Sequence, residues 1–268
     1  MHQTWGGVSM DGEQVNAAAP ELHSVPPRIS TDPVRRETWG ELAAPGSYAN
    51  GRFDVDINFI GDSTFRAVFD RAADRWESII TGDLTDVTFG GFFIDDLRID
   101  ASVVAIDGPN GILGQAGPTN IRFQQNSDGT SIGGLPFKGV MEFESADMAT
   151  MQMSGILDHV ILHEMGHVLG IGTLWKNPLT SYVGGPWDRY TNNPANQLAN
   201  SSFQYTGGNA SSQFQGYGGS GLTPIADVGG AGSIGSHWRE SIFDAELMTP
   251  NAEGSPPMPL SRITIGSL

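Results

Sequence analysis

The sequence predicts an α+β protein in which a few strands and helices are separated by long irregular segments, and three observations carry this prediction. Residues 53–59 alternate apolar and polar side chains, as in a strand that buries one face. Residues 65–80 and 154–169 instead carry their apolar side chains at helical spacing. The 268 residues also include 36 Gly and 16 Pro, which favour turns and irregular chain over regular elements.

The predicted elements fall into three parts of the chain. Residues 1–48 are rich in Pro, Ala, Ser and Glu, and they predict an extended tail or pro-segment. Residues 49–175 hold the predicted sheet and both helices, whereas residues 176–268 predict a loop-rich C-terminal subdomain. In the sheet-bearing part we expect strands at 53–59 and near 98–106, 121–124 and 139–144, with a Gly/Pro loop at 107–120. We expect helices at 65–80, closed by Gly82 and Asp83, and at 154–169, ended by Gly170. A long loop at 176–236 and a last helix capped by Ser261 follow.

Charge and cysteine content exclude several classes of protein. With 14 basic and 30 acidic residues, the net charge of −16 argues against a nucleic-acid binder and against docking on anionic membranes. The chain has no Cys, so disulfides, thiol catalysis and Cys-bound metal are excluded. No apolar run is long enough to predict a membrane span, and the N-terminus does not resemble a conventional signal peptide.

The motif His163-Glu164-Met165-Gly166-His167 lies inside the second predicted helix. Side chains four residues apart share one helix face, so both imidazoles can bind one Zn²⁺. Glu164 follows the first imidazole and is near enough to act as general base on a zinc-bound water without binding the metal itself. The alternative is a pair of surface histidines on an amphipathic helix.

A catalytic zinc usually has a third protein ligand, and the sequence leaves several candidates for it. The pattern continues to Gly170, but Thr173 stands where the extended form H-E-x-x-H-x-x-G-x-x-H carries its third His. Of the other histidines, His237 is the best candidate, because Trp238 lies beside it and Met248 follows. A regular helix does not wrap three consecutive i,i+4 side chains around one tetrahedral ion, which argues against His159. The remaining candidates, His2 and His23, lie in the predicted tail.

Two clusters of residues resemble the leishmanolysin family of metzincin metalloendopeptidases. The first is HEMGHVLG at His163–Gly170, and the second, after a long insertion, comprises Gly235–Trp238 and Glu246–Thr249. The resemblance covers roughly residues 50–268. It implies a metzincin (zincin) fold: a twisted, mostly parallel sheet with a backing helix and an active-site helix, followed by a loop-rich C-terminal subdomain that brings the third ligand and the Met-turn.

The resemblance also implies a role for each matching residue. His163, His167 and His237 would bind one catalytic Zn²⁺, with Glu164 as general base. Met248 would be the methionine of the Met-turn beneath the metal, and Gly170 would end the active-site helix. Two features depart from the family: the chain has no Cys for disulfides or cysteine-dependent latency, and Pro250 stands where astacin-like relatives have a Tyr ligand.

The implied function is that of a secreted zinc endopeptidase, which hydrolyses extended protein or peptide substrates through a zinc-bound water. By analogy with metzincins, the substrate would pair with an edge strand formed by Val140, Met141, Glu142, Phe143 and Glu144, although an ordinary strand of the sheet would explain these residues equally well. A structural Ca²⁺ at an unassigned position would also suit an acidic, loop-rich chain, and the oligomeric state is left open.

Two other functions compete with the peptidase. One is a non-catalytic, zinc-stabilised adhesin or binding module on the same scaffold, but Glu164 argues against it because a structural zinc needs no general base. The other is a non-proteolytic metallohydrolase, which would leave the Met-turn resemblance of Met248 unexplained.

Overall fold

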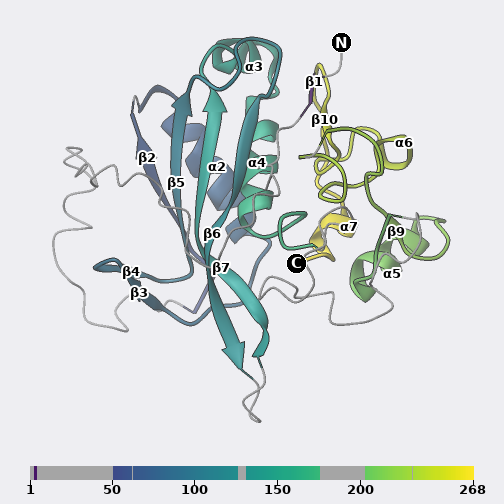
Figure 1. Cartoon of the computed structure of the whole chain (residues 1–268), viewed down its shortest axis with the longest axis horizontal. Helices are drawn as coiled ribbons and strands as arrows, with labels where there is room; N and C mark the ends of the chain where they lie inside the picture. Colours follow the sequence, from purple (N-terminus) through teal and green to yellow (C-terminus); the bar gives the residue numbers. More distant parts are fainter. Residues whose placement is uncertain (1–2, 5–50, 62, 126–130, 176–202, 231) are drawn as a thin grey trace.

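In the computed structural model, the described residues are 3–4, 51–61, 63–125, 131–175, 203–230 and 232–268. The centre is a four-stranded sheet in the order β2-β5-β7-β6 (Figure 1). Its strands are β2 (Val55–Ile60), β5 (Leu97–Val104), β6 (Gly114–Gln125) and β7 (Ser131–Glu144). β2, β5 and β7 are parallel, whereas β6 runs antiparallel to β7 at the end of the sheet. A mixed α+β fold with a mostly parallel sheet is therefore confirmed.

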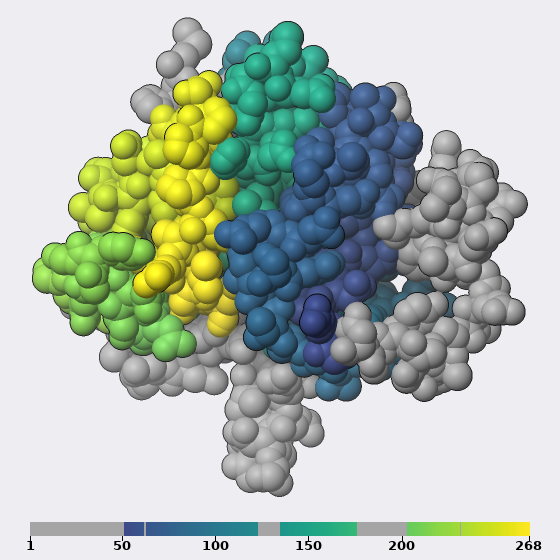
Figure 2. All heavy atoms as spheres, turned by 180° about the vertical axis from the view of Figure 1, so that it is seen from behind, coloured from purple at the N-terminus to yellow at the C-terminus, as the bar shows by residue number. Residues whose placement is uncertain are grey.

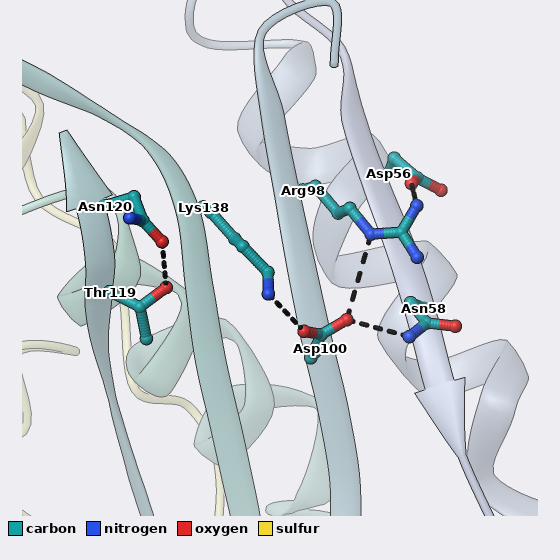
Figure 3. Close-up of polar contacts among 7 residues, drawn as sticks. All are labelled: Asp56, Asn58, Arg98, Asp100, Thr119, Asn120 and Lys138. Carbon is teal, nitrogen blue, oxygen red and sulfur yellow. Dashed lines mark hydrogen bonds and ion pairs between the residues drawn. The ribbon is translucent and has the colours of Figure 1, made fainter. Parts of the chain in front are cut away.

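The strands alternate between a core face and a polar face, as their sequences predict. Val55, Ile57, Leu97 and Ile99 are buried, whereas their neighbours in sequence point to the opposite face. That opposite face carries a row of polar contacts across three strands (Figure 3). The contacts join Arg98 to Asp56 at 3.2 Å, Arg98 to Asp100 at 3.8 Å, Asn58 to Asp100 at 2.7 Å and Lys138 to Asp100 at 3.0 Å.

Two helices, α2 (Arg66–Glu77) and α4 (Leu157–Val168), cover the core face of the sheet (Figure 1). A short 3-10 turn, η1 (Ser63–Phe65), leads into α2. Trp76 of α2 is fully buried and donates its indole N–H to the Leu162 carbonyl of α4 at 3.1 Å. The predicted helix at 154–169 is in fact preceded by a separate helix, α3 (Met148–Ser154), because Gly155 adopts a left-handed conformation that ends α3.

The prediction of a loop at 107–120 is wrong from Gly114 onward, because β6 begins there. Gly and Pro residues suggested irregular chain, but Pro118 lies on the end strand of the sheet, where the missing N–H is tolerated, and the pairing shifts register beside it. β7 also begins earlier than predicted, at Ser131, and forms a long hairpin with β6. A smaller hairpin of β3 (Val87–Phe89) and β4 (Phe92–Ile94) precedes β5.

The C-terminal part contains short elements around a cluster of aromatic rings. The rings of Trp175, Tyr205 and Trp238 lie within 5.5 Å of one another, centroid to centroid. Part of the long loop predicted at 176–236 is therefore structured, and its stretch 176–202 lies outside the described residues. The elements are β8 (Gln204–Tyr205), α5 (Gly208–Gly216), β9 (Thr223–Pro224), α6 (Glu240–Phe243), β10 (Asn251–Ala252) and α7 (Arg262–Ile265).

The C-terminal part lies against earlier parts of the chain. In Figure 2 its last residues, drawn in yellow, lie next to the blue and teal residues of the sheet-bearing part. The predicted cap of the last helix is confirmed, since the Ser261 hydroxyl accepts the Thr264 N–H at 3.2 Å. β1 (Gln3–Thr4) pairs with β10, while the rest of the predicted tail lies outside the described residues. Within the described residues, no helix is long and apolar enough to cross a membrane.

Candidate metal centre

Helix α4 carries His163 and His167 on one face, and both side chains are fully buried. The helix ends as predicted before Gly170, whose φ of +105° turns the chain away from the helix axis. Two residues later, Gly172 lies so close to the Ser236 carbonyl that a Cβ would be 1.9 Å from its oxygen. This close approach brings the segment that carries His237 to the end of α4.

The imidazoles of His163, His167 and His237 meet at one point in the core. Their Nε2 atoms are 3.0 Å apart between His163 and His167, 3.1 Å between His167 and His237, and 3.2 Å between His237 and His163. All three side chains are 0% exposed. The structure therefore brings together the two histidines of the motif and the predicted third histidine, which are within reach of a single metal ion.

Each imidazole is oriented by a carbonyl oxygen at its other nitrogen. The Nδ1 of His163 lies 2.6 Å from the Leu247 oxygen, that of His167 lies 2.8 Å from the Ile171 oxygen, and that of His237 lies 3.2 Å from the Ser233 oxygen. A carbonyl oxygen only accepts, so each Nδ1 must carry the proton. The three Nε2 atoms are then unprotonated, and their lone pairs converge.

Burial keeps these imidazoles neutral. It lowers the pKa of His167 to about 4 and lowers the pKa values of His163 and His237 well below the usual range. A neutral imidazole with a free lone pair is the form that binds a metal. Three converging lone pairs without a proton between them repel one another, so this donor set fits a divalent cation such as Zn²⁺, which favours nitrogen ligands.

Glu164 follows His163 on α4 and is also fully buried. Neither of its carboxylate oxygens has a hydrogen-bond partner among the described residues, and desolvation raises its pKa well above the usual range. β6 passes next to it, because a Cβ on Gly114 would lie 3.1 Å from the Glu164 Cγ. A buried carboxyl group without a hydrogen-bond partner is costly and calls for an explanation, of which a catalytic role is one. Glu164 is therefore a candidate for proton transfer at this site.

Met248, the predicted Met-turn residue, packs against Gly166 of the motif. Its side chain is fully buried, and a Cβ on Gly166 would lie 2.9 Å from its sulfur. The glycine within the motif thus leaves space for the methionine. Sequence reasoning missed the contribution of Leu247, whose carbonyl orients His163, because no side-chain pattern indicates a main-chain acceptor.

Residues 140–144 form a strand, but the prediction that they lie at the edge of the sheet, where a substrate could pair with them, is wrong. These residues of β7 pair with β5 on one side and with β6 on the other, so they have no free edge. Glu144 is buried, and its carboxylate accepts N–H groups from Ile106, Asp107, Gly108 and Ala146. These bonds lower its pKa to about 2. The two end strands of this sheet are β2 and β6, and the sequence had partly assigned β6 to a loop.

Other predicted sites are not brought together. His159 lies one turn before His163 but is not part of the histidine group, whereas His2 and His23 lie outside the described residues. Two groups of three carboxylates lie close together, namely Asp83, Asp95 and Asp96, and Glu240, Asp244 and Glu253. Grouping alone does not indicate a bound ion, so the expected structural Ca²⁺ is not supported.

Comparison with known proteins supports the family resemblance. Residues 130–258 match the family model described as leishmanolysin. The matched segment includes His163, Glu164, His167, His237 and Met248, together with the insertion between them. The family implies metallopeptidase activity on protein or peptide substrates. No curated protein matches the chain.

Proposed function

From the identification of this chain as leishmanolysin-like, we propose that it is a zinc-dependent endopeptidase of the metzincin class. The observation that carries the proposal is the convergence of three unprotonated Nε2 atoms, together with a buried carboxylate on the same helix, that of Glu164, which has no hydrogen-bond partner among the described residues. The first subdomain, residues 49–175, supplies His163 and His167, and the second, residues 176–268, supplies His237. The family supports action outside the cell.

Each residue of the site has a definable task in peptide hydrolysis. His163, His167 and His237 would hold the zinc ion, which lowers the pKa of a water toward 7 and polarises the scissile carbonyl when bound. Glu164 accepts the proton of the attacking water and then passes it to the leaving amine.

The substrate strand in this proposal is β6 rather than residues 140–144. β6 forms the end of the sheet, and its first residue lies against the side chain of Glu164. Among the described residues, no strand pairs with the outer edge of β6, and an extended peptide that paired there would pass the proposed general base. Main-chain hydrogen bonds to such an edge give affinity for extended substrates of many sequences.

Cleavage of casein with and without a metal chelator tests the peptidase. The wild type is expected to cleave casein, to lose this activity with chelator and to regain it with added zinc. Glu164→Gln should abolish cleavage while keeping zinc, because Glu164 is not a ligand. Asp158→Asn is the matched control, since it changes an exposed carboxylate on the same helix. A wild type that binds zinc but does not cleave casein would instead favour the alternative function, a non-catalytic, zinc-stabilised binding module.

A further inference from the structure

Glu246 lies two residues before Met248, and its side chain is buried. Three donors surround its carboxylate. The Met248 N–H donates to Oε2 at 2.6 Å, whereas the Ser261 N–H at 3.1 Å and the Thr264 hydroxyl both donate to Oε1. Because every partner donates, this carboxylate acts only as an acceptor. It thereby joins the turn at residues 246–248 to the start of α7.

Thr264 extends the connection to the residue that follows His237. The indole N–H of Trp238 donates to the Thr264 hydroxyl oxygen at 2.7 Å, so the hydroxyl accepts from Trp238 and donates to Glu246. The backbone N–H of Trp238 also donates to the Met248 carbonyl at 2.9 Å. Trp238 and Thr264 are both fully buried. These contacts hold the His237 segment and the turn against each other.

Leu247 connects the same turn to helix α4. Its carbonyl oxygen lies 2.6 Å from the Nδ1 of His163, and its N–H donates to the Pro259 carbonyl at 3.0 Å. Leu247 lies between Glu246 and Met248. These two residues share a hydrogen bond, which sets the position of Leu247. A shift of this turn would therefore move the group that orients His163.

We propose that Glu246 and Thr264 are positioning residues of the metal centre, which hold the turn at 246–248 and Trp238 so that His163 and His237 present their Nε2 atoms to one ion. The proposal rests on the zinc site of the proposed function. Groups that orient metal ligands typically contribute about 10–100-fold to metal affinity. Neither residue belongs to the histidine group that would hold the metal, so each would act through the residues that it contacts.

Zinc affinity, measured by competition with a chromogenic chelator on the full chain, tests this role. Glu246→Gln places an NH₂ group opposite a donor, and Thr264→Val removes the hydroxyl at constant shape. Both should bind zinc about 10–100-fold more weakly than the wild type, and the visible spectrum of the Co²⁺-loaded protein should change. Thr264→Ser, which keeps the hydroxyl, should retain the zinc affinity of the wild type and the visible spectrum of its Co²⁺-loaded form. The control is Thr223→Val, because Thr223 is equally buried but its hydroxyl contacts Ser211.

Amide hydrogen exchange of the wild type tests the same coupling without any substitution. If the contacts of Glu246 favour metal binding, zinc must stabilise them in return. The amides of Met248 and Ser261 should then gain more protection on zinc loading than that of Leu84, which donates to the distant carboxylate of Asp96. Equal gains, or wild-type zinc affinity in both variants, would overturn the inference. A wild type that binds no zinc would overturn the proposed function instead.

Discussion

The imidazoles of the candidate metal centre owe their protonation state to main-chain carbonyls, and this makes each ligand individually testable. His237 is the only one of the three that does not lie on α4, and the Ser233 carbonyl fixes its tautomer. Its removal leaves two ligands on one helix, which are too few for a stable zinc site.

His237→Ala is expected to weaken zinc binding by more than the roughly 10–100-fold typical of a lost outer partner. His159→Ala serves as the control, because His159 lies on the same helix as two of the ligands but is not part of the histidine group. Metal content after dialysis and chelator competition measure the effect. Equal zinc content in both variants would remove His237 from the ligand set.

Gly114 limits the space beside Glu164. A Cβ at this position would lie 3.1 Å from the Glu164 Cγ and 3.0 Å from the ring of Phe143. Because a small displacement of a catalytic group can cost up to about 100-fold in rate, Gly114→Ala should lower kcat while zinc content stays at the wild-type level. Gly82→Ala is the control, since nothing lies within 4 Å of its Cβ. An unchanged kcat for Gly114→Ala would argue against this constraint.

At the scale of elements, residues 106–108, which precede β6, are bound through hydrogen bonds to one carboxylate of β7, that of Glu144. Glu144 accepts the N–H groups of three consecutive residues, Ile106, Asp107 and Gly108, at 2.6 to 2.9 Å. This segment leads directly into the strand that we propose pairs with substrate. The pKa of about 2 for Glu144 makes the contact dependent on pH.

The sign of that dependence follows from the lowered pKa. Above the ordinary value of 4.5, Glu144 is charged in the folded and unfolded chains alike, and its contribution to stability is complete. As the pH falls from 4.5 toward 2, the unfolded chain takes up a proton that the folded chain resists, so the contribution is lost. The free energy of unfolding of Glu144→Gln should therefore lie below that of the wild type at neutral pH, and the two should converge toward pH 2. Urea unfolding at several pH values measures this; a constant difference would contradict it.

At the scale of the molecule, the proposed metal ligands join α4 to a segment about seventy residues away along the chain. A metal that binds only the folded arrangement stabilises it by mass action, by about 2.7 kcal/mol when free metal is at 100 times its Kd. Removal of the metal should therefore lower the thermal midpoint of the whole chain.

Calorimetry of the zinc-loaded and metal-free wild type measures this difference. His237→Ala provides the comparison, because its thermal midpoint should respond little to zinc. A zinc-dependent midpoint that is the same in the variant and in the wild type would show that the stabilising ion binds elsewhere.

The features that sequence determined by itself are local ones. The spacing of His163 and His167 places both on one helix face, whatever surrounds the helix. Glu164 stands between them in the sequence and so lies on the same helix. Alternation in residues 53–59 and the cap at Ser261 also depend only on near neighbours, and both predictions are confirmed. His237 was one of several candidates for the third ligand, and only the resemblance gave it and Met248 definite roles.

Tertiary structure decided what depends on partners distant in sequence. The strand at 140–144 lies inside the sheet because β6 pairs with its outer side, and no property of those five residues states which strands flank them. The orientation of His163 likewise depends on a carbonyl 84 residues away. Periodicity and capping reflect short-range sterics and hydrogen bonds, whereas the edge of the sheet, the tautomers of the histidines and the contacts of Glu246 arise only when remote segments pack together.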